Sequence, residues 1–179
     1  DGQPLPAASV GSLVWDGGFE RGFTGGGFGW RREDIAGASF DFDTETRHSG
    51  VRSLRVSFDG SANLDFGHAK QLVPVEPNTR YHFAAYLRTD DLSTDSGIRF
   101  LLTFQQAPGS QFFLTADLTG THPWTLQEID FTTGPETHLA QIALRRLPNE
   151  KFDNKLRGTV WVDDVSLTPL LPEGARHSP

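Results

Sequence analysis

Short segments in which apolar and polar residues alternate follow one another along this chain, and Gly, Pro, Asn and Asp separate them. In "SLRVSF" (53–58), Leu54, Val56 and Phe58 fall on one face of an extended strand, and the polar residues between them fall on the other. Nowhere does an apolar pattern of helical period persist for three turns. The pattern therefore predicts an all-β chain.

The same alternation predicts nine or ten strands. In "RYHFAAYLRT" (80–89) the inward set is Tyr81, Phe83, Ala85 and Leu87. Further strands are expected at 38–43, 64–73, 98–106, 111–118, 125–132, 139–146 and 159–168. Turn residues separate them in "EPNT" (76–79), "TDDLSTDSG" (89–97), "APGS" (107–110) and "TGPET" (133–137). This spacing is typical of a two-sheet antiparallel β-sandwich with jelly-roll topology.

Composition excludes several classes of protein. The 179 residues carry a net charge of −7 with the basic residues scattered, which argues against a nucleic-acid-binding surface. No apolar run approaches the length that crosses a bilayer, and the absence of Cys excludes disulfides and thiolate metal sites. We expect one domain over 10–169 with tails at 1–9 and 170–179. Because the sequence begins at Asp1 without a signal-like segment, we expect it to be a piece of a longer protein.

The residues that could be catalytic do not have the spacing of known catalytic motifs. Glu128 and Asp130 share one face of a strand, as the acids of some jelly-roll glycosidases do, but Thr133 occupies the position where the second Glu of such a pair would stand. An exposed acidic strand face is the simpler interpretation. The six His residues have no metal-ligand spacing, and no nucleophile elbow or phosphate loop is present. We therefore do not expect an enzyme.

Five fragments occur in a fixed order along the chain. They are "WDGGFERG" (15–22), "GW" (29–30), "SGVRSL" (49–54), "PNTRY" (77–81) and "DDV" (163–165). Together they resemble the β-jelly-roll carbohydrate-binding modules related to families 4, 9 and 22, which accompany cellulases and xylanases. The resemblance spans about 13–168, and Asp16 stands where that family usually has Asn.

The resemblance implies a buried structural calcium ion (Ca²⁺) that joins the first segment, the Ser-Gly turn and the last strand. The implied ligands are the carboxylates of Glu20 and Asp163 with main-chain carbonyls near Gly18 and His48, since Ca²⁺ prefers hard oxygen donors. Asp164 competes with Asp163, because adjacent strand residues point in opposite directions; we favour Asp163. The alternative is an exposed Glu20 and an Asp163 that accepts turn hydrogen bonds.

The resemblance also implies a sugar-binding groove lined by outward-facing side chains. The candidates are His82, Tyr86, Arg88, Arg99, Gln105, Gln141 and Arg145. Ordinary solvated side chains on an outer sheet face are the alternative, since the 14 Phe and two Tyr favour core filling over sugar platforms.

The expected function is non-catalytic polysaccharide or oligosaccharide binding that tethers a larger secreted or cell-surface protein. Two alternatives remain: a calcium-stabilised structural or protein-interaction sandwich without sugar binding, and a jelly-roll enzyme that acts on glycans.

Overall fold

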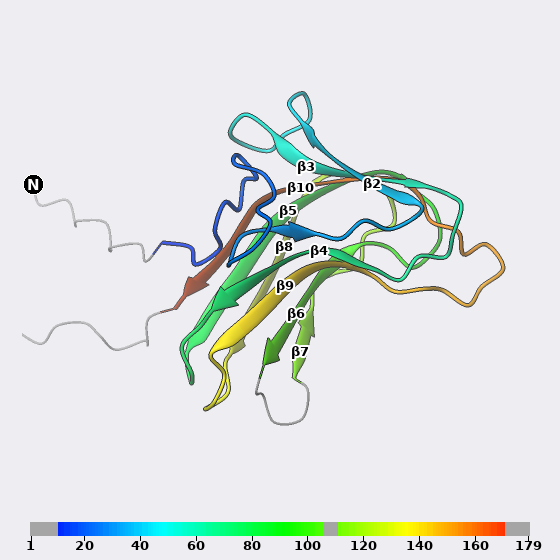
Figure 1. Cartoon of the computed structure of the whole chain (residues 1–179). Helices are drawn as coiled ribbons and strands as arrows, with labels where there is room; N and C mark the ends of the chain where they lie inside the picture. The colour runs from blue at the N-terminus through cyan, green and yellow to red at the C-terminus, as the bar shows by residue number, and fades with distance from the viewer. Residues whose placement is uncertain (1–10, 106–110, 171–179) are drawn as a thin grey trace, which may run out of the picture.

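The computed structural model describes residues 11–105 and 111–170, which form an antiparallel β-sandwich of two five-stranded sheets (Figure 1). The strands are β1 (Arg31–Arg32), β2 (Ala38–Asp43), β3 (Ser53–Asp59), β4 (Phe66–Pro74), β5 (Arg80–Leu92), β6 (Arg99–Gln105), β7 (Phe112–Leu114), β8 (Gly120–Thr132), β9 (Leu139–Arg146) and β10 (Arg157–Pro169). The described residues contain no helix that could span a membrane. The expected fold class is confirmed.

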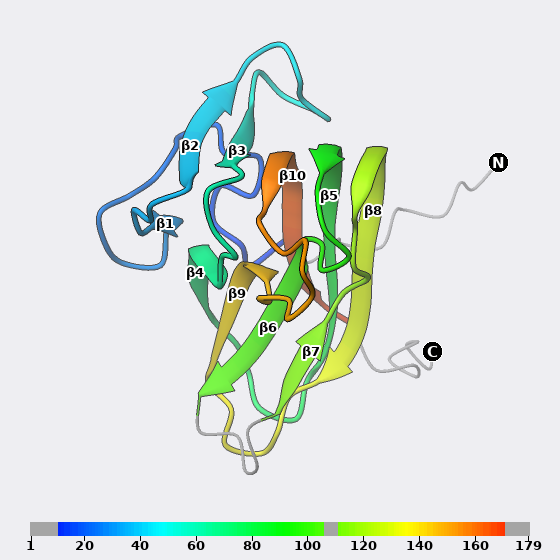
Figure 2. The same ribbon diagram turned by 90° about the vertical axis from the view of Figure 1, so that its right-hand side faces the viewer.

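The strand order shows how segments distant in sequence meet. Sheet A has the order β1-β4-β9-β6-β7, and sheet B has the order β2-β3-β10-β5-β8. The two layers face each other, with β6, β7 and β9 in front of β5, β8 and β10 in the view of Figure 2. The last strand, β10, lies between β3 and β5 in the middle of sheet B. This placement brings residues 163–165 beside the first turns of the chain.

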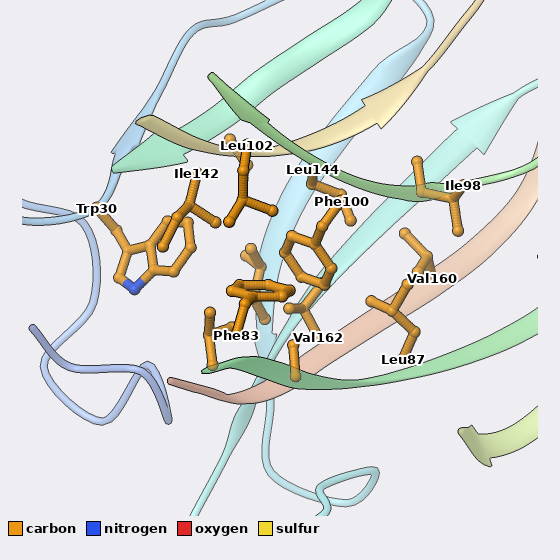
Figure 3. Packing of buried hydrophobic residues seen from close by; sticks show 14 of the residues in the cluster. Trp30, Phe83, Leu87, Ile98, Phe100, Leu102, Ile142, Leu144, Val160 and Val162 are labelled. Carbon is orange, nitrogen blue, oxygen red and sulfur yellow. The ribbon is translucent and has the colours of Figure 1, made fainter. Parts of the chain in front are cut away.

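The core fills the space between the sheets. Phe83, Leu87 and Val162 of sheet B meet Phe100 and Ile142 of sheet A there, and all are at most 1% exposed (Figure 3). The predicted inward set of the strand 80–89 is confirmed, because Tyr81, Phe83, Ala85 and Leu87 are all buried. Such interdigitated apolar side chains are the main source of stability in a sandwich.

Several strand boundaries differ from the sequence prediction. The segment 89–97 was expected to be a turn throughout, but β5 continues to Leu92 because Thr89 and Leu92 are buried and pair with β8. The segment 111–118 forms only the short β7 and an isolated bridge between Leu118 and Ile98. β8 begins at Gly120 rather than at 125, and the two-residue β1 was not predicted. The turn 107–110 and the tail residues 1–9 and 171–179 lie outside the described residues.

Arg146 fixes the loops at one end of the sandwich. The side chain is fully buried at the end of β9, and its guanidinium donates to the carbonyl oxygens of Leu64, Ser96 and Asn154. Burial lowers the pKa of Arg146, although carbonyl groups of three loops accept hydrogen bonds from the charged group. Arg146 thus acts as a structural cross-link rather than as a surface charge.

The described N-terminal residues run beside β10. The amide of Leu13 donates to the carbonyl of Leu167 at 2.8 Å, and the Leu167 amide donates to Ser12 Oγ at 3.1 Å. In Figure 1 this first segment is drawn in blue next to the brown β10. The two ends of the described chain therefore lie together.

Candidate functional site

The segment "WDGGFERG" packs the start of the chain against β10. A Cβ at Gly17 would lie 1.9 Å from the carbonyl oxygen of Val165, and the Val165 amide donates to the Gly17 carbonyl at 2.9 Å. Asp16 Oδ2 accepts hydrogen bonds from the amides of Arg21 and Gly22, which closes the turn. Phe19 is fully buried in this turn. The segment is therefore a structural element that places Gly18 and Glu20 beside the last strand.

Asp163 is the buried carboxylate at the centre of this region. Its side chain is 0% exposed, and Oδ2 accepts the amides of His48 at 2.8 Å and Ser49 at 3.1 Å. Oδ1 accepts the amide of Asp164 at 2.8 Å. Burial raises the pKa of Asp163 and the neighbouring Asp164 charge raises it too, against the opposing effect of the Ser49 and His48 amides. A cation beside this carboxylate would favour its ionised form.

Asp164 does not point away from this region, as simple alternation would require. A β-bulge lies here, because three steps along β10 from Asp163 to Ser166 match two steps along β5. Asp164 takes a positive φ of 49°, and its carboxylate contacts His48 Nδ1 and Ser49 Oγ, each at 2.6 Å. Both carboxylates therefore hold the same turn. The strict alternation on which the choice between them depended does not hold here, because of the bulge.

Glu20 approaches the same turn from the other side. Its Oε1 accepts the amide of Val51 at 2.9 Å, and a Cβ at Gly50 would lie 1.8 Å from that oxygen. Gly50 also has a positive φ of 61°. The Ser-Gly pair of the motif is explained by these two facts, since only Gly fits both the backbone conformation and the contact.

The predicted metal ligands are gathered in one place. A Cβ at Gly18 would lie 3.7 Å from both Asp163 Oδ1 and Glu20 Cγ. Asp163 uses three of its roughly four acceptor positions, so Oδ1 keeps one, and Glu20 Oε2 accepts no hydrogen bond from the described residues. These free oxygens are of the kind that Ca²⁺ prefers.

The geometry also limits which groups could bind a metal ion between Glu20 and Asp163. Among the described residues, no group of three or more His, Cys, Asp or Glu side chains could hold a metal ion. An ion here would therefore need main-chain carbonyl oxygens in addition to the two carboxylates. His48 meets Asp163 through its amide and Asp164 through its ring. Glu20 is exposed, and Asp163 accepts turn hydrogen bonds, which are the features expected of the alternative without an ion.

The seven predicted groove residues do not form one groove. Three of them, His82, Tyr86 and Arg88, lie on β5 in sheet B, whereas the other four lie on β6 and β9 in sheet A. The inward neighbours of both sets are buried between the sheets, so the two sets face solvent on opposite sides of the sandwich. The prediction of a single groove from these seven residues is therefore wrong. Alternation shows which residues of a strand point outward, but it does not show to which sheet the strand belongs.

Two aromatic rings on the outer face of sheet B, those of Tyr86 and Trp161, have another side chain over them. His48 stacks on Tyr86 with ring centroids 3.7 Å apart, and Arg88 lies over the Trp161 ring at 5.7 Å. His82 and Asp130 are hydrogen-bonded at 2.7 Å on the acidic face of β8, next to Glu128. The interpretation of Glu128 and Asp130 as an exposed strand face is confirmed, and Arg80 forms an ion pair with Asp130 there at 2.8 Å.

The outer face of sheet A contains a hollow of about 430 Å³ over β6, β7 and β9. Leu101 and Thr103 of β6 form its floor, Phe112 and Leu114 of β7 form one side, and Arg145 of β9 borders it. Phe112 is 57% exposed, and the predicted residue Gln141 pairs with Thr103 on the same face. Such volumes are typical of small-ligand sites.

The sequence prediction missed Leu101, Thr103, Phe112 and Leu114. Period-two alternation from Arg99 to Gln105 places Leu101 and Thr103 on the outer face, so this signal was present. Phe112 carried no such signal, because only the pairing of β7 with β6 shows that it stands at this hollow.

Structural comparison identifies the fold. The chain resembles a family 16 carbohydrate-binding module with a TM-score of 0.61 and 18% identity, over 87% of this chain and 99% of the other. It also resembles the CBM22-1 xylan-binding domain from Paenibacillus barcinonensis Xyn10C, with a TM-score of 0.58 and 18% identity over 91% and 97% of the two chains. The chain has the β-jelly-roll fold of carbohydrate-binding modules related to families 4 and 22.

A further solved structure extends this result. The module TmCBM61, solved in complex with beta-1,4-galactotriose, matches with a TM-score of 0.56 and 15% identity over 89% of this chain and 99% of the module. The carbohydrate-binding-module fold is thus matched over nearly the full length of independent modules. No family model matches the sequence.

Two curated proteins match part of the sequence. The tRNA(Glu)-specific nuclease WapA of Bacillus subtilis subsp. natto (strain BEST195) is 32% identical over 124 residues, and the tRNA nuclease WapA of Bacillus subtilis (strain 168) is 30% identical over the same length. Each match covers 66% of this chain but only 5% of the relative. That share is too small to carry the named nuclease activity over to this chain.

Proposed function

We propose that this chain is a non-catalytic carbohydrate-binding module whose sugar site is the hollow on sheet A. The observation that carries the proposal is an open hollow with an exposed Phe112 on a fold shared with carbohydrate-binding modules. An exposed aromatic face stacks on a pyranose ring, and polar neighbours such as Thr103, Gln141 and Arg145 supply hydrogen bonds to hydroxyl groups.

The state of the two outer faces favours sheet A over sheet B. On sheet B, the faces of Tyr86 and Trp161 are already occupied by His48 and Arg88, so stacking a sugar there would first require their displacement. Phe112 faces solvent and needs no such displacement. Within the predicted set, Arg145 lines the hollow, and Arg99, Gln105 and Gln141 lie on the strands β6 and β9 of the same sheet. His82, Tyr86 and Arg88 lie on β5 in the other sheet and have no part in the proposed site.

We further propose that the module tethers a larger secreted or cell-surface protein to a polysaccharide. The matched curated relatives are long chains of which this sequence aligns with only a small part, which supports a role as one module among others. Tethering requires only modest affinity, because several binding modules on one chain raise the effective concentration.

The test of sugar binding uses neutral polysaccharides. We expect retardation of the wild-type chain in affinity electrophoresis on at least one of xylan, β-1,4-galactan and mixed-linkage β-glucan. Phe112→Ala should weaken that binding about tenfold, since losing one aromatic stacking face costs on the order of 1–1.5 kcal/mol. Phe152→Ala is the matched control, because Phe152 is fully exposed but lies outside the hollow.

Two results would decide against this site. Equal binding by the wild type and Phe112→Ala would place the sugar elsewhere. No binding across a broad glycan array would favour the alternative of a structural or protein-interaction sandwich. A reducing-sugar assay on the bound polysaccharide tests the remaining alternative, an enzyme, and we expect no release of reducing ends.

We also propose that a structural Ca²⁺ ion occupies the region between Gly18, Glu20 and Asp163. Support comes from the free oxygens of Glu20 and Asp163 and from the burial of Asp163, which is costly for an unpaired charge. Bound there, the ion would supply positive charge beside the Asp163 carboxylate. The chain's own residues already orient that carboxylate through three amide hydrogen bonds.

A further inference from the structure

A second hollow, of about 680 Å³, lies at the edge of the sandwich where β1 and β2 come near each other. The chain from Arg21 to Gly25 forms one wall, and β1 with Phe42 of β2 and Arg52 forms the rest. Figure 2 shows β1 and β2 on the same side of the molecule. None of its lining residues belongs to the sugar hollow on sheet A.

Four arginines border this hollow in a chain that is acidic as a whole. They are Arg21, Arg31, Arg32 and Arg52. The sequence contains 16 basic and 23 acidic residues, so four guanidinium groups around one cavity are a local reversal of the chain's charge. The one acidic residue in the lining, Glu33, forms an ion pair with Lys70, and this contact lowers the pKa of Glu33.

Most of this positive charge has no carboxylate partner among the described residues. Arg32 contacts Asp34 at 3.8 Å in an exposed pair, but no ion pair involves the other three arginines. Arg31 donates to the Gly27 carbonyl, and Arg52 donates to the carbonyls of Phe19 and Glu20. These carbonyl oxygens orient the guanidinium groups. Because a carbonyl carries no net charge, the positive charge of each guanidinium is not neutralised.

Aromatic rings hold two of the arginines in position. The Arg52 guanidinium lies 4.3 Å from the centroid of Phe42, and that of Arg32 lies 5.8 Å from the centroid of Phe23. Stacking of this kind leaves the guanidinium edges available for hydrogen bonds and reduces the side-chain entropy lost on binding. The arginines are therefore arranged before any ligand arrives.

We propose that this hollow binds an oxyanion, a phosphate or carboxylate group carried by a ligand about the size of a sugar. Guanidinium groups bind both anions through paired, charge-assisted hydrogen bonds. The volume is within the range of small-ligand pockets and exceeds what a bare ion fills. This inference does not depend on the sugar site of sheet A.

The test measures anion binding by the whole chain at low ionic strength. The probes are inorganic phosphate, glucose 6-phosphate and digalacturonic acid in isothermal titration calorimetry, with glucose as the neutral control. Two-dimensional NMR of the arginine Nε–H groups reports where each probe binds. We expect saturable binding of at least one anionic probe, shifts confined to the arginines of this hollow, and weakening as NaCl is added.

Variants decide whether the hollow is responsible. Arg31→Gln and, separately, Arg21→Gln should each weaken binding about tenfold, as expected for the loss of a hydrogen bond to a charged group. Arg157→Gln removes the same charge from an exposed arginine that pairs with Asp91 outside the hollow, and it should bind as the wild type does. Arg21 is the second variant because its side chain is exposed, makes no hydrogen bond in the described structure and lies only over the Trp15 ring at 5.8 Å, so its loss should disturb folding little.

Each outcome has a definite meaning. Binding of both phosphate probes without digalacturonic acid identifies phosphate as the group recognised, and the reverse identifies carboxylate. The proposal is overturned if none of the three anionic probes binds saturably. It is also overturned if Arg157→Gln weakens binding as much as Arg31→Gln does, since net charge alone would then explain the result.

Discussion

Gly50 shows how a single residue sets the geometry of the carboxylate site. Its backbone has a positive φ, and the space that a side chain would take is filled by Glu20 Oε1. The Ser-Gly fragment was recognisable in the sequence, but the reason for the Gly was not. That reason depends on a residue 30 positions earlier, which only the folded chain brings near.

We predict that Gly50→Ala destabilises the domain by about 1–3 kcal/mol, because it combines backbone strain with displacement of Glu20. Urea unfolding followed by tryptophan fluorescence measures the change. Gly25→Ala is the matched control, since nothing lies within 4 Å of a Cβ there, and it should change stability by less than about 0.5 kcal/mol. Equal stability of Gly50→Ala and the wild type would contradict the contact with Glu20.

The residues of the arginine hollow could not be predicted from the sequence. Arg21, Arg31 and Arg52 are separated by ten or more positions, and each looks like an ordinary surface charge in its own segment. Their shared cavity depends on the packing of β1 near β2, and β1 is a two-residue strand with too short a pattern to recognise. Residues 18, 20, 48, 163 and 164 were predictable together only because the resemblance linked their fragments.

At the scale of elements, alternation predicted most strands and their inward faces. The strands at 38–43 and 139–146 have the predicted bounds. Alternation failed at the Asp163–Asp164 bulge, where one extra residue turns both carboxylates toward the same loop. Alternation also could not predict which strands belong to which sheet, because sheet membership depends on long-range pairing rather than on local pattern.

Asp43 fastens the edge strand β2 to the loop that follows it and to β10. Its Oδ1 accepts the amides of Glu45 and Thr46, and its Oδ2 accepts Trp161 Nε1 at 2.8 Å. Burial raises the pKa of Asp43, but the hydrogen bonds from Thr46, Trp161 and Glu45 outweigh it, with a smaller contribution from Arg55, so the pKa is lowered overall. The ionised form is therefore favoured by folding.

This pKa shift predicts a pH-dependent contribution to stability. Because the folded pKa of Asp43 lies below its ordinary value of 3.8, the stabilisation is complete above that value and is lost as the pH falls through the folded pKa. We expect Asp43→Asn to be less stable than the wild type by about 1–2 kcal/mol at pH 6, and the difference to shrink below about pH 4.

Thermal unfolding of both proteins between pH 6 and pH 2.5 measures this difference. Asp34→Asn is the control, because the Asp34 side chain is 88% exposed and contacts only Arg32. Its difference from the wild type should stay near zero throughout. A gap for Asp43→Asn that stays constant or widens as the pH falls would contradict the role of its charge.

At the scale of the whole molecule, the carboxylate site links three segments that lie far apart in the sequence. Glu20, the 48–51 turn and Asp163 come from the first turn, the β2–β3 connection and the last strand. An ion bound there would stabilise the folded chain by mass action, because the unfolded chain cannot assemble the ligands.

We predict that Ca²⁺ at about 100 times its dissociation constant raises the melting temperature by roughly 5–10 °C after prior treatment with chelator. Glu20→Gln keeps an acceptor for the Val51 amide but removes the charge, so it should lose most of this shift. Glu128→Gln, on the exposed face of β8, should keep it. Identical melting of the wild-type protein in chelator and in Ca²⁺ would contradict the proposed ion, and the hydrogen bonds of Glu20, Asp163 and Asp164 would then hold the region without it.

The pairing of Leu13 with Leu167 decides how this sandwich would sit in a longer polypeptide. A host polypeptide that continues from both ends of the described chain would enter and leave the domain at adjacent points. The domain would then project to one side of the host. Tension along such a host would act directly on the hydrogen bonds that join residues 12–13 to Leu167.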